Sequence, residues 1–407
     1  MSKEISDTVR SDFPILGRKI LENNLIYFDT AASAQKPSIV IDEVTDFYQN
    51  HYSNVSRGVH TLCVDATFKY EGARKKVQKF INAKSENEII FTKSATEGIN
   101  LVAQTFCEKY MKNGDEVILS IMEHHSNIVP WFFLREKYGI VIKFSNITED
   151  GEIDVDHFKS LINDKTKIAS VTHLSNVFGT ITNKEIIKIC RENNIVTLFD
   201  GCQSTAHCEI DVQDLDCDFF VFSGHKIYGP SGIGVLYGKE SILDELPPYQ
   251  GGGGMISEVS LDEVSFAPLP AKYEAGTPPI VEAYGLGIAI DYVNSIGMKN
   301  IIEHEKNLTA YAQKKLSDLS FIDIYGNAKN KTSIISFNLK NIHAHEVSSF
   351  LDVDGIAVRA GHHCCQPLMK HLKVNATSRA SFGVYNTTEE IDVFINSLNK
   401  CINFFNK

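Results

Sequence analysis

Apolar runs of strand length alternate with helical patterns through the first two-thirds of the chain. Helical candidates lie at 95–110 and 184–193. The predicted strands cover residues 88–92, 116–120, 167–172, 196–200 and 218–223. This alternation is typical of βαβ units and a mainly parallel sheet. In such sheets ligands collect at the carboxyl ends of the strands.

Two glycine-containing segments, 251–254 and 276–279, interrupt this pattern. A helix-rich stretch and shorter strand-like runs follow them. We therefore expect an α/β fold with a large, mainly parallel-sheet domain and a smaller α+β domain. The predicted organisation is an N-terminal arm at 1–25, a large domain at 26–279 and a small C-terminal domain at 280–407.

Composition and charge narrow the classes of function. The 407 residues suffice for a large buried core. A net charge of −11 argues against general binding to nucleic acid or to anionic membranes. Nine cysteines, an odd number, and a polar start at 1–7 without an apolar signal core favour a reducing cytoplasm. No apolar run approaches the roughly 18 residues of a membrane-spanning helix.

The run 359–367 gathers unusual chemistry, because it holds a guanidinium, two imidazoles and two adjacent thiols. These residues are Arg359, His362, His363, Cys364 and Cys365. A free cysteine is more often a small buried hydrophobe than a reagent. Here the flanking glycine and proline indicate a loop, and cationic neighbours favour a thiolate. Adjacent thiols converge poorly on one tetrahedral ion and no C-x-x-C spacing occurs, so we expect no metal.

Three further features fit a phosphate-bearing cofactor. The segment 92–100 follows a strand and opens a helix, where hydroxyls and free N–H groups can hold phosphate. Simple helix capping by Ser94 or Thr96 is the alternative, and neither the dinucleotide fingerprint nor the nucleotide P-loop is present. Asp200 ends one strand and Lys226 follows the next.

A turn-forming Asp and a solvated Lys are the ordinary interpretations of Asp200 and Lys226. However, a Lys among apolar neighbours can become a nucleophilic amine. Together with a phosphate cup, the pair matches the needs of pyridoxal phosphate, namely a partner for the pyridine nitrogen, a Schiff-base amine and an anion site.

With these features the chain resembles the class V aminotransferase family of fold-type-I pyridoxal-phosphate enzymes. More closely, it is similar to the SufS-type cysteine desulfurases, a group that also includes selenocysteine lyases. The motifs that carry the resemblance run along the whole chain, at 28–37, 122–131, 359–367 and 377–382.

The resemblance implies a role for each matched residue. Lys226 would carry the cofactor, Cys364 would be the nucleophile, and His124 would stack on the ring and take part in proton transfer. Asp200 would pair with the pyridine nitrogen and Gln203 with the phenolic oxygen. Phosphate would be held by Thr96, Ser223 and His225, and by Thr277 from the second subunit of a homodimer. The substrate carboxylate would be bound by Asn176 and Arg379, with Arg359 at the border of the site.

The resemblance also implies a reaction. L-Cysteine would become L-alanine, and the sulfur would remain as a persulfide on Cys364. A SufE- or SufU-like protein would take this sulfur for iron–sulfur cluster assembly. A selenocysteine lyase or another class V aminotransferase, in which Cys364 is dispensable, is the alternative. A sulfur-trafficking or metal-binding scaffold on an inactive fold is the third hypothesis.

Two positions depart from the family pattern. Ser56 stands where the family usually has His, which removes an expected contributor to the rim of the site. Cys365 replaces the usual Ala after the nucleophile. A second thiol there could resolve or store sulfur, but we expect it to pack inward.

Overall fold

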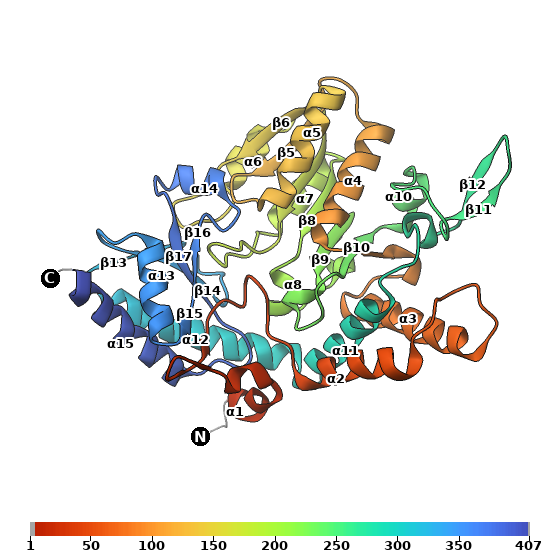
Figure 1. Cartoon of the computed structure of the whole chain (residues 1–407). Helices are drawn as coiled ribbons and strands as arrows, with labels where there is room; N and C mark the ends of the chain where they lie inside the picture. The colour runs from red at the N-terminus through yellow and green to blue at the C-terminus, as the bar shows by residue number, and fades with distance from the viewer. Residues whose placement is uncertain (1–4, 406–407) are drawn as a thin grey trace.

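A seven-stranded sheet forms the centre of the larger body of the molecule (Figure 1). The computed structural model describes residues 5–405. The strand order is β4-β10-β9-β8-β7-β5-β6, in which β9 through β6 are parallel and β10 is antiparallel to both neighbours. The strands are β4 (Ile89–Thr92), β5 (Glu116–Ser120), β6 (Val141–Ser145), β7 (Thr166–Thr172), β8 (Val196–Asp200), β9 (Phe219–Ser223) and β10 (Gly234–Gly238). The predicted mainly parallel α/β fold is confirmed.

Both faces of this sheet are covered, which explains its nearly continuous apolar strands. In β9, Phe219 and Val221 join the core beneath α4 (Ala95–Tyr110) and α5 (Val129–Tyr138). Phe220 and Phe222 point to the opposite core. That second core includes α3 (Thr61–Phe80), α7 (Glu185–Glu192) and α11 (Ile280–Ile296).

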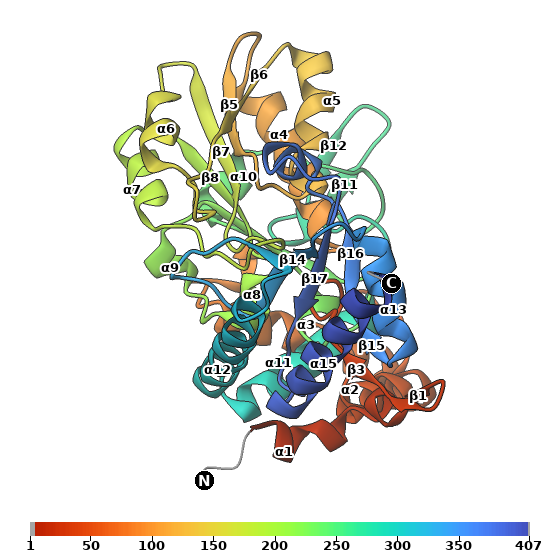
Figure 2. The same cartoon turned by 90° about the vertical axis from the view of Figure 1, so that its left-hand side faces the viewer.

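A second, antiparallel sheet has the order β13-β14-β17-β16. Its strands are β13 (Ile322–Tyr325), β14 (Ile334–Leu339), β16 (Arg359–Gly361) and β17 (Thr377–Ser381). One core joins this sheet to α12 (Met298–Ser317), α13 (Ala344–Val353) and α15 (Thr388–Phe405). Figure 2 shows this smaller body beside the large sheet.

Elements close to each of the two predicted domain boundaries contact the body to which the prediction does not assign them. Helix α11 packs against α3 and α2 (Ser38–Asp46) of the large body. Strand β3 (Ile26–Tyr27) pairs in parallel with β15 (Ile356–Ala357) of the small one. The division at 25/26 and 279/280 therefore stays a prediction.

The remaining elements are short. They are α1 (Ile5–Val9), β1 (Lys19–Ile20), β2 (Asn23–Asn24), α6 (Val155–Ser160), α8 (Ser204–His207), α9 (Val212–Leu215), α10 (Glu240–Glu245), β11 (Ile256–Val259), β12 (Val264–Phe266) and α14 (Gln366–His371). The β11–β12 hairpin extends away from the body (Figure 1). No helix within residues 5–405 is long and apolar enough to cross a bilayer.

Candidate active site

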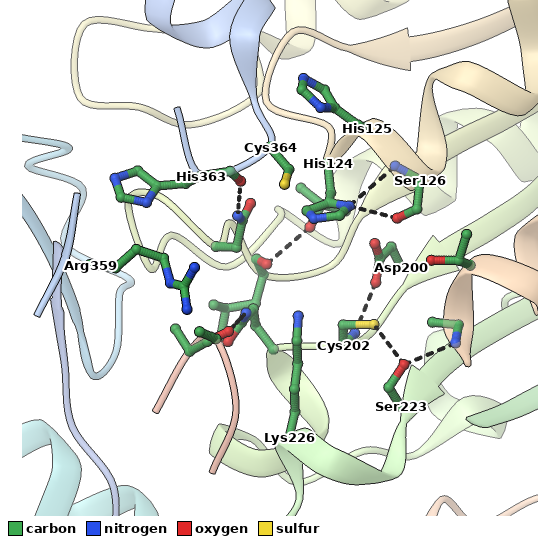
Figure 3. Close-up of a pocket in the computed structure, with 18 of the residues that line it drawn as sticks. His124, His125, Ser126, Asp200, Cys202, Ser223, Lys226, Arg359, His363 and Cys364 are labelled. Carbon is green, nitrogen blue, oxygen red and sulfur yellow. Dashed lines mark hydrogen bonds between the residues drawn. The ribbon is translucent and has the colours of Figure 1, made fainter. Parts of the chain in front are cut away.

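A cavity of about 560 Å³ lies at the carboxyl ends of β7, β8 and β9, where the small body meets the large sheet (Figure 3). Its wall includes the predicted site residues Thr96, His124, Asn176, Asp200, Gln203, Ser223, His225, Lys226, Arg359, Cys364 and Arg379. The predicted position at the ends of parallel strands is thus the position of the cavity. The role of each residue remains a prediction.

The floor of the cavity is made by the ends of β8 and β9. Asp200 is buried, and its Oδ1 accepts a hydrogen bond from Cys202 N at 3.0 Å. Ser223 Oγ accepts from Ala95 N at 2.9 Å, which fixes the first turn of α4 beside it. A Cβ on Gly201 would lie 2.0 Å from Phe220 Cζ, so only glycine permits this turn after Asp200.

An anion fits at the N-terminus of α4. Ser94 caps this helix, Thr96 is exposed in its first turn, and the hydroxyl of Ser223 and the imidazole of His225 line the same part of the cavity. Backbone N–H groups and the helix dipole favour negative charge at such a position. The two alternatives for the segment 92–100 are therefore compatible, because Ser94 caps the helix while Thr96 lines the cavity.

Lys226 lies in the short turn after β9, and its side chain rises into the cavity between Asp200 and Arg359 (Figure 3). Its positive charge acts on the neighbouring imidazole of His124. Burial, followed by the charge of Lys226, lowers the pKa of His124 to about 4. Nδ1 of His124 accepts from Ser126 N at 3.2 Å, so the neutral ring carries its proton on Nε2.

Cys364 comes from the opposite wall, in the turn between β16 and α14. His363 and Cys364 both have positive φ, at 51° and 55°. This left-handed conformation is costly for residues other than glycine and is held here by neighbouring contacts. His125 N donates to Cys364 O at 2.7 Å, and Asn176 Nδ2 donates to His363 O at 2.8 Å. The turn leaves the Cys364 side chain exposed.

The sequence predicts cationic neighbours for the thiols of the run 359–367, but one of its two imidazoles is neutral. His363 is buried, and its Nε2 lies 2.8 Å from Thr377 Oγ1. Burial and the charge of Arg379 lower the pKa of His363 to about 2. His363 is therefore neutral at physiological pH and supports the loop from inside, whereas His362 is exposed.

Two arginines share one carboxylate at the substrate side of the cavity. Asp29 accepts from Arg359 Nη2 at 2.9 Å and from Arg379 Nη2 at 3.3 Å. Arg379 is only 2% exposed, and its Nη1 donates to Asn176 O at 2.8 Å. Its Nε has no hydrogen-bond partner within residues 5–405. Arg379 also lines the cavity, and the planar fork of a guanidinium suits a carboxylate.

Sequence reasoning missed several contributors. Asp29 lies in the motif 28–37 without a role assigned to it, and its partners are 330 and 350 residues away. His125, Ser126 and Cys202 also line the cavity. The adjacent His124-His125 pair was a usable signal, because both imidazoles fall in one predicted motif.

Two named positions lie away from this cavity. Thr277 is exposed and lines a separate cavity beside Phe91, Tyr249 and Glu274. Ser56 is also exposed, and its N donates to Thr67 Oγ1 at 2.9 Å. In a single chain, therefore, neither residue reaches the candidate site.

Comparison with known proteins agrees with this geometry. The family model described as aminotransferase class-V matches residues 26–394. A probable cysteine desulfurase from Synechocystis is 46% identical over 98% of this chain and 96% of its own length. A probable cysteine desulfurase from Halalkalibacterium halodurans is 47% identical, with 98% of each chain covered.

Solved structures give the same grouping. A cysteine desulfurase from Thermococcus onnurineus superposes with a TM-score of 0.93 and 38% identity over 99% of each chain. A cysteine desulfurase from Escherichia coli, in an S-sulfonic acid form, has a TM-score of 0.91 and 34% identity over 98% of each chain. The chain belongs to the aminotransferase class-V family and, within it, groups with proteins named cysteine desulfurase.

Proposed function

We propose that the protein is a pyridoxal-phosphate-dependent cysteine desulfurase, a sulfurtransferase that converts L-cysteine to L-alanine and retains the sulfur on Cys364. One observation carries the proposal. A single cavity brings an amine, a buried carboxylate and an exposed thiol together from three separate segments, as Lys226, Asp200 and Cys364. The names of the relatives support the same activity.

The residues fit the cofactor. Asp200 ends β8 at the floor, where its carboxylate suits a protonated ring nitrogen. Thr96, Ser223 and His225 offer donors to the phosphate at the start of α4, and Gln203 lines the same cavity. His124, as a neutral imidazole, would stack on the ring of the cofactor. When bound, pyridoxal phosphate supplies an electron sink for negative charge at the substrate Cα.

The chain's own side chains divide the remaining work. Lys226 would carry the cofactor and, once displaced by substrate, remove the Cα proton. Arg379 and Asn176 would hold the substrate carboxylate, beside Arg359. The thiolate of Cys364 would then attack the substrate sulfur as the C–S bond breaks. The balance is L-cysteine plus protein thiol giving L-alanine plus protein persulfide.

The proposal includes a homodimer. Large apolar side chains are exposed along α2, α3 and the segment between them. They are Ile39, Ile41, Tyr48, Tyr52, Val59, Leu62, Val64 and Phe68. Such a contiguous stretch on a protein of this size is typical of an interface. A second copy would be the source of the Thr277 contact with phosphate.

The sulfur needs a destination, because release of sulfide would waste it. Cys364 lies on an exposed turn that a partner can approach. We assign that partner the chemistry of a SufE- or SufU-like acceptor protein, with iron–sulfur cluster assembly as the use of the sulfur. The nine cysteines are all free within the described chain, which suits a reducing cytoplasm.

The decisive test is an alanine-release assay on the cofactor-loaded protein with L-cysteine and with L-selenocysteine. We expect cysteine turnover that rises with an acceptor protein and is lost in Cys364→Ala but not in Cys401→Ala. Cys401 is a buried thiol of α15 outside the cavity and serves as the matched control. Selenocysteine turnover that survives Cys364→Ala, without any cysteine turnover, would support the lyase instead.

A further inference from the structure

Cys365, the residue after the proposed nucleophile, is built into the wall behind the cavity. Its side chain is fully buried, whereas Cys364 next to it is exposed. Cys365 Sγ donates to Asn176 Oδ1 at 3.2 Å and lies 3.6 Å from Met122 O. Burial raises the pKa of the Cys365 thiol well above its usual range, so the group stays a neutral donor. A buried neutral thiol is inert toward sulfur transfer.

The amide of Asn176 connects this thiol to the nucleophile turn. While Oδ1 accepts from Cys365, Nδ2 of the same amide donates to His363 O at 2.8 Å. The backbone oxygen of Asn176 accepts from Arg379 Nη1 at 2.8 Å. One asparagine therefore joins the thiol, the turn and the buried arginine.

The donor at Cys365 reinforces the observed orientation of the Asn176 amide. With the amide flipped, Oδ1 would face His363 O, and two acceptors would oppose each other. A thiol proton in front of Oδ1 adds to this preference, whereas with an alanine side chain only the contact with His363 O would remain to favour it. The turn needs such a tether, because His363 and Cys364 hold the left-handed conformation that non-glycine residues adopt only under constraint.

We propose that Cys365 is a positioning residue, which orients the Asn176 amide and so holds the turn that presents Cys364. Only the expected effect on catalysis rests on the proposed desulfurase function. The tether itself is a property of the folded chain.

The direct test is hydrogen–deuterium exchange of the peptide spanning residues 359–368 in the cofactor-loaded protein. We expect Cys365→Ala to accelerate exchange there about three- to tenfold, the range of one lost hydrogen bond. Cys365→Ser keeps a donor at this position and should restore most of the protection. Cys190→Ala is the matched control, because Cys190 is equally buried in α7 and its thiol donates no hydrogen bond within the described chain.

A second arm tests the path through Asn176. If the thiol acts through the amide, Cys365→Ala added to Asn176→Ala should cause no further acceleration. Independent, additive effects would overturn the assignment, as would parental exchange in Cys365→Ala. Comparable acceleration in Cys190→Ala would also overturn it, because the effect would then be general loosening.

Kinetics separate this inference from the proposed function. We expect Cys365→Ala to lower kcat for alanine release about threefold with little change in KM, and Cys365→Ser to restore kcat. If the parent releases no alanine from cysteine, the proposed function fails while the exchange result still decides the tether. If alanine is released but Cys365→Ala matches the parent in kcat and in exchange, only this inference fails.

Discussion

The two walls of the cavity are built in opposite ways. Lys226 and Asp200 lie at the ends of β9 and β8, in a sheet whose strands are buried on both faces. Cys364 lies on an exposed turn with two consecutive residues at positive φ. The first wall suits chemistry that needs a fixed, desolvated position. The second suits a group that meets substrate inside and a sulfur acceptor outside, so it has to be presented by a tether.

The largest expected effect concerns the first wall, formed by the strand ends that carry Lys226 and Asp200, which we call the rigid wall. Lys226→Ala should reduce alanine release about a thousandfold or more, because both the amine that carries the cofactor and the base are lost. The variant should also lack the borohydride-reducible absorbance of the parent. Its melting temperature should stay close to that of the parent, since Lys226 is not part of the buried core. A coloured, active Lys226→Ala protein would refute the assignment of this wall.

A buried imidazole directly after β7 should add to the acid sensitivity of the fold. Burial lowers the pKa of His173, which follows β7, to about 4. An unfolded chain takes up this proton near the ordinary value of about 6.5, so His173 costs stability as the pH falls from 6.5 toward 4. The full cost approaches about 3 kcal/mol.

This effect is measured as the melting temperature of the parent minus that of His173→Gln. We expect the difference to shrink as the pH falls from 7 to 4.5. His362→Gln, in the exposed turn, is the matched control for the loss of an imidazole outside the buried core. A constant difference for His173→Gln would show that its imidazole is not buried in the neutral form.

A medium effect tests the substrate side between the two walls. Arg379→Lys keeps the charge but loses the planar fork that holds Asp29 at the wall of the cavity. We expect kcat/KM for cysteine to fall about ten- to a hundredfold, mainly through KM. Lys143→Arg, on β6, is a control that should leave both constants unchanged. A fall in kcat alone would place Arg379 in the chemical step instead.

The smallest expected effect concerns the orientation of the His124 imidazole. Ser126→Ala removes the hydroxyl that lies 2.7 Å from His124 Nδ1 but keeps the backbone donor of Ser126. We expect kcat to fall about two- to fivefold. Ser160→Ala, at the exposed last residue of α6 in the large body, should have no effect on kcat. A loss above a hundredfold would give the hydroxyl a direct catalytic role.

The sequence predicted the rigid wall well because its signals are local. Apolar runs such as 219–222 are continuous where both faces of the sheet are buried, and Asp200 and Lys226 come directly after such runs. The named strands did not include β6, which lies at the sheet edge, or the glycine-flanked β10. Their weaker apolar patterns reflect partial burial and close packing rather than a different fold.

The second wall, the turn that carries Cys364, was less predictable, because its structure depends on contacts with residues far away in the sequence. The cluster around Cys364 was visible, but not that His363 turns inward to Thr377. Nor does any local pattern reveal that Asn176, 187 residues from His363, holds the turn. Such pairings depend on how the two bodies pack, which spacing along the chain does not encode.

The most direct test of the account is a single-turnover measurement with ³⁵S-labelled L-cysteine, followed by mass analysis of the peptide that contains Cys364 and Cys365. We predict one labelled sulfur on Cys364, none on Cys365, and an equal amount of alanine. No label should appear on either residue in Lys226→Ala. Alanine release without a persulfide on Cys364, or label on Cys365 instead, would contradict the division of labour between the two walls.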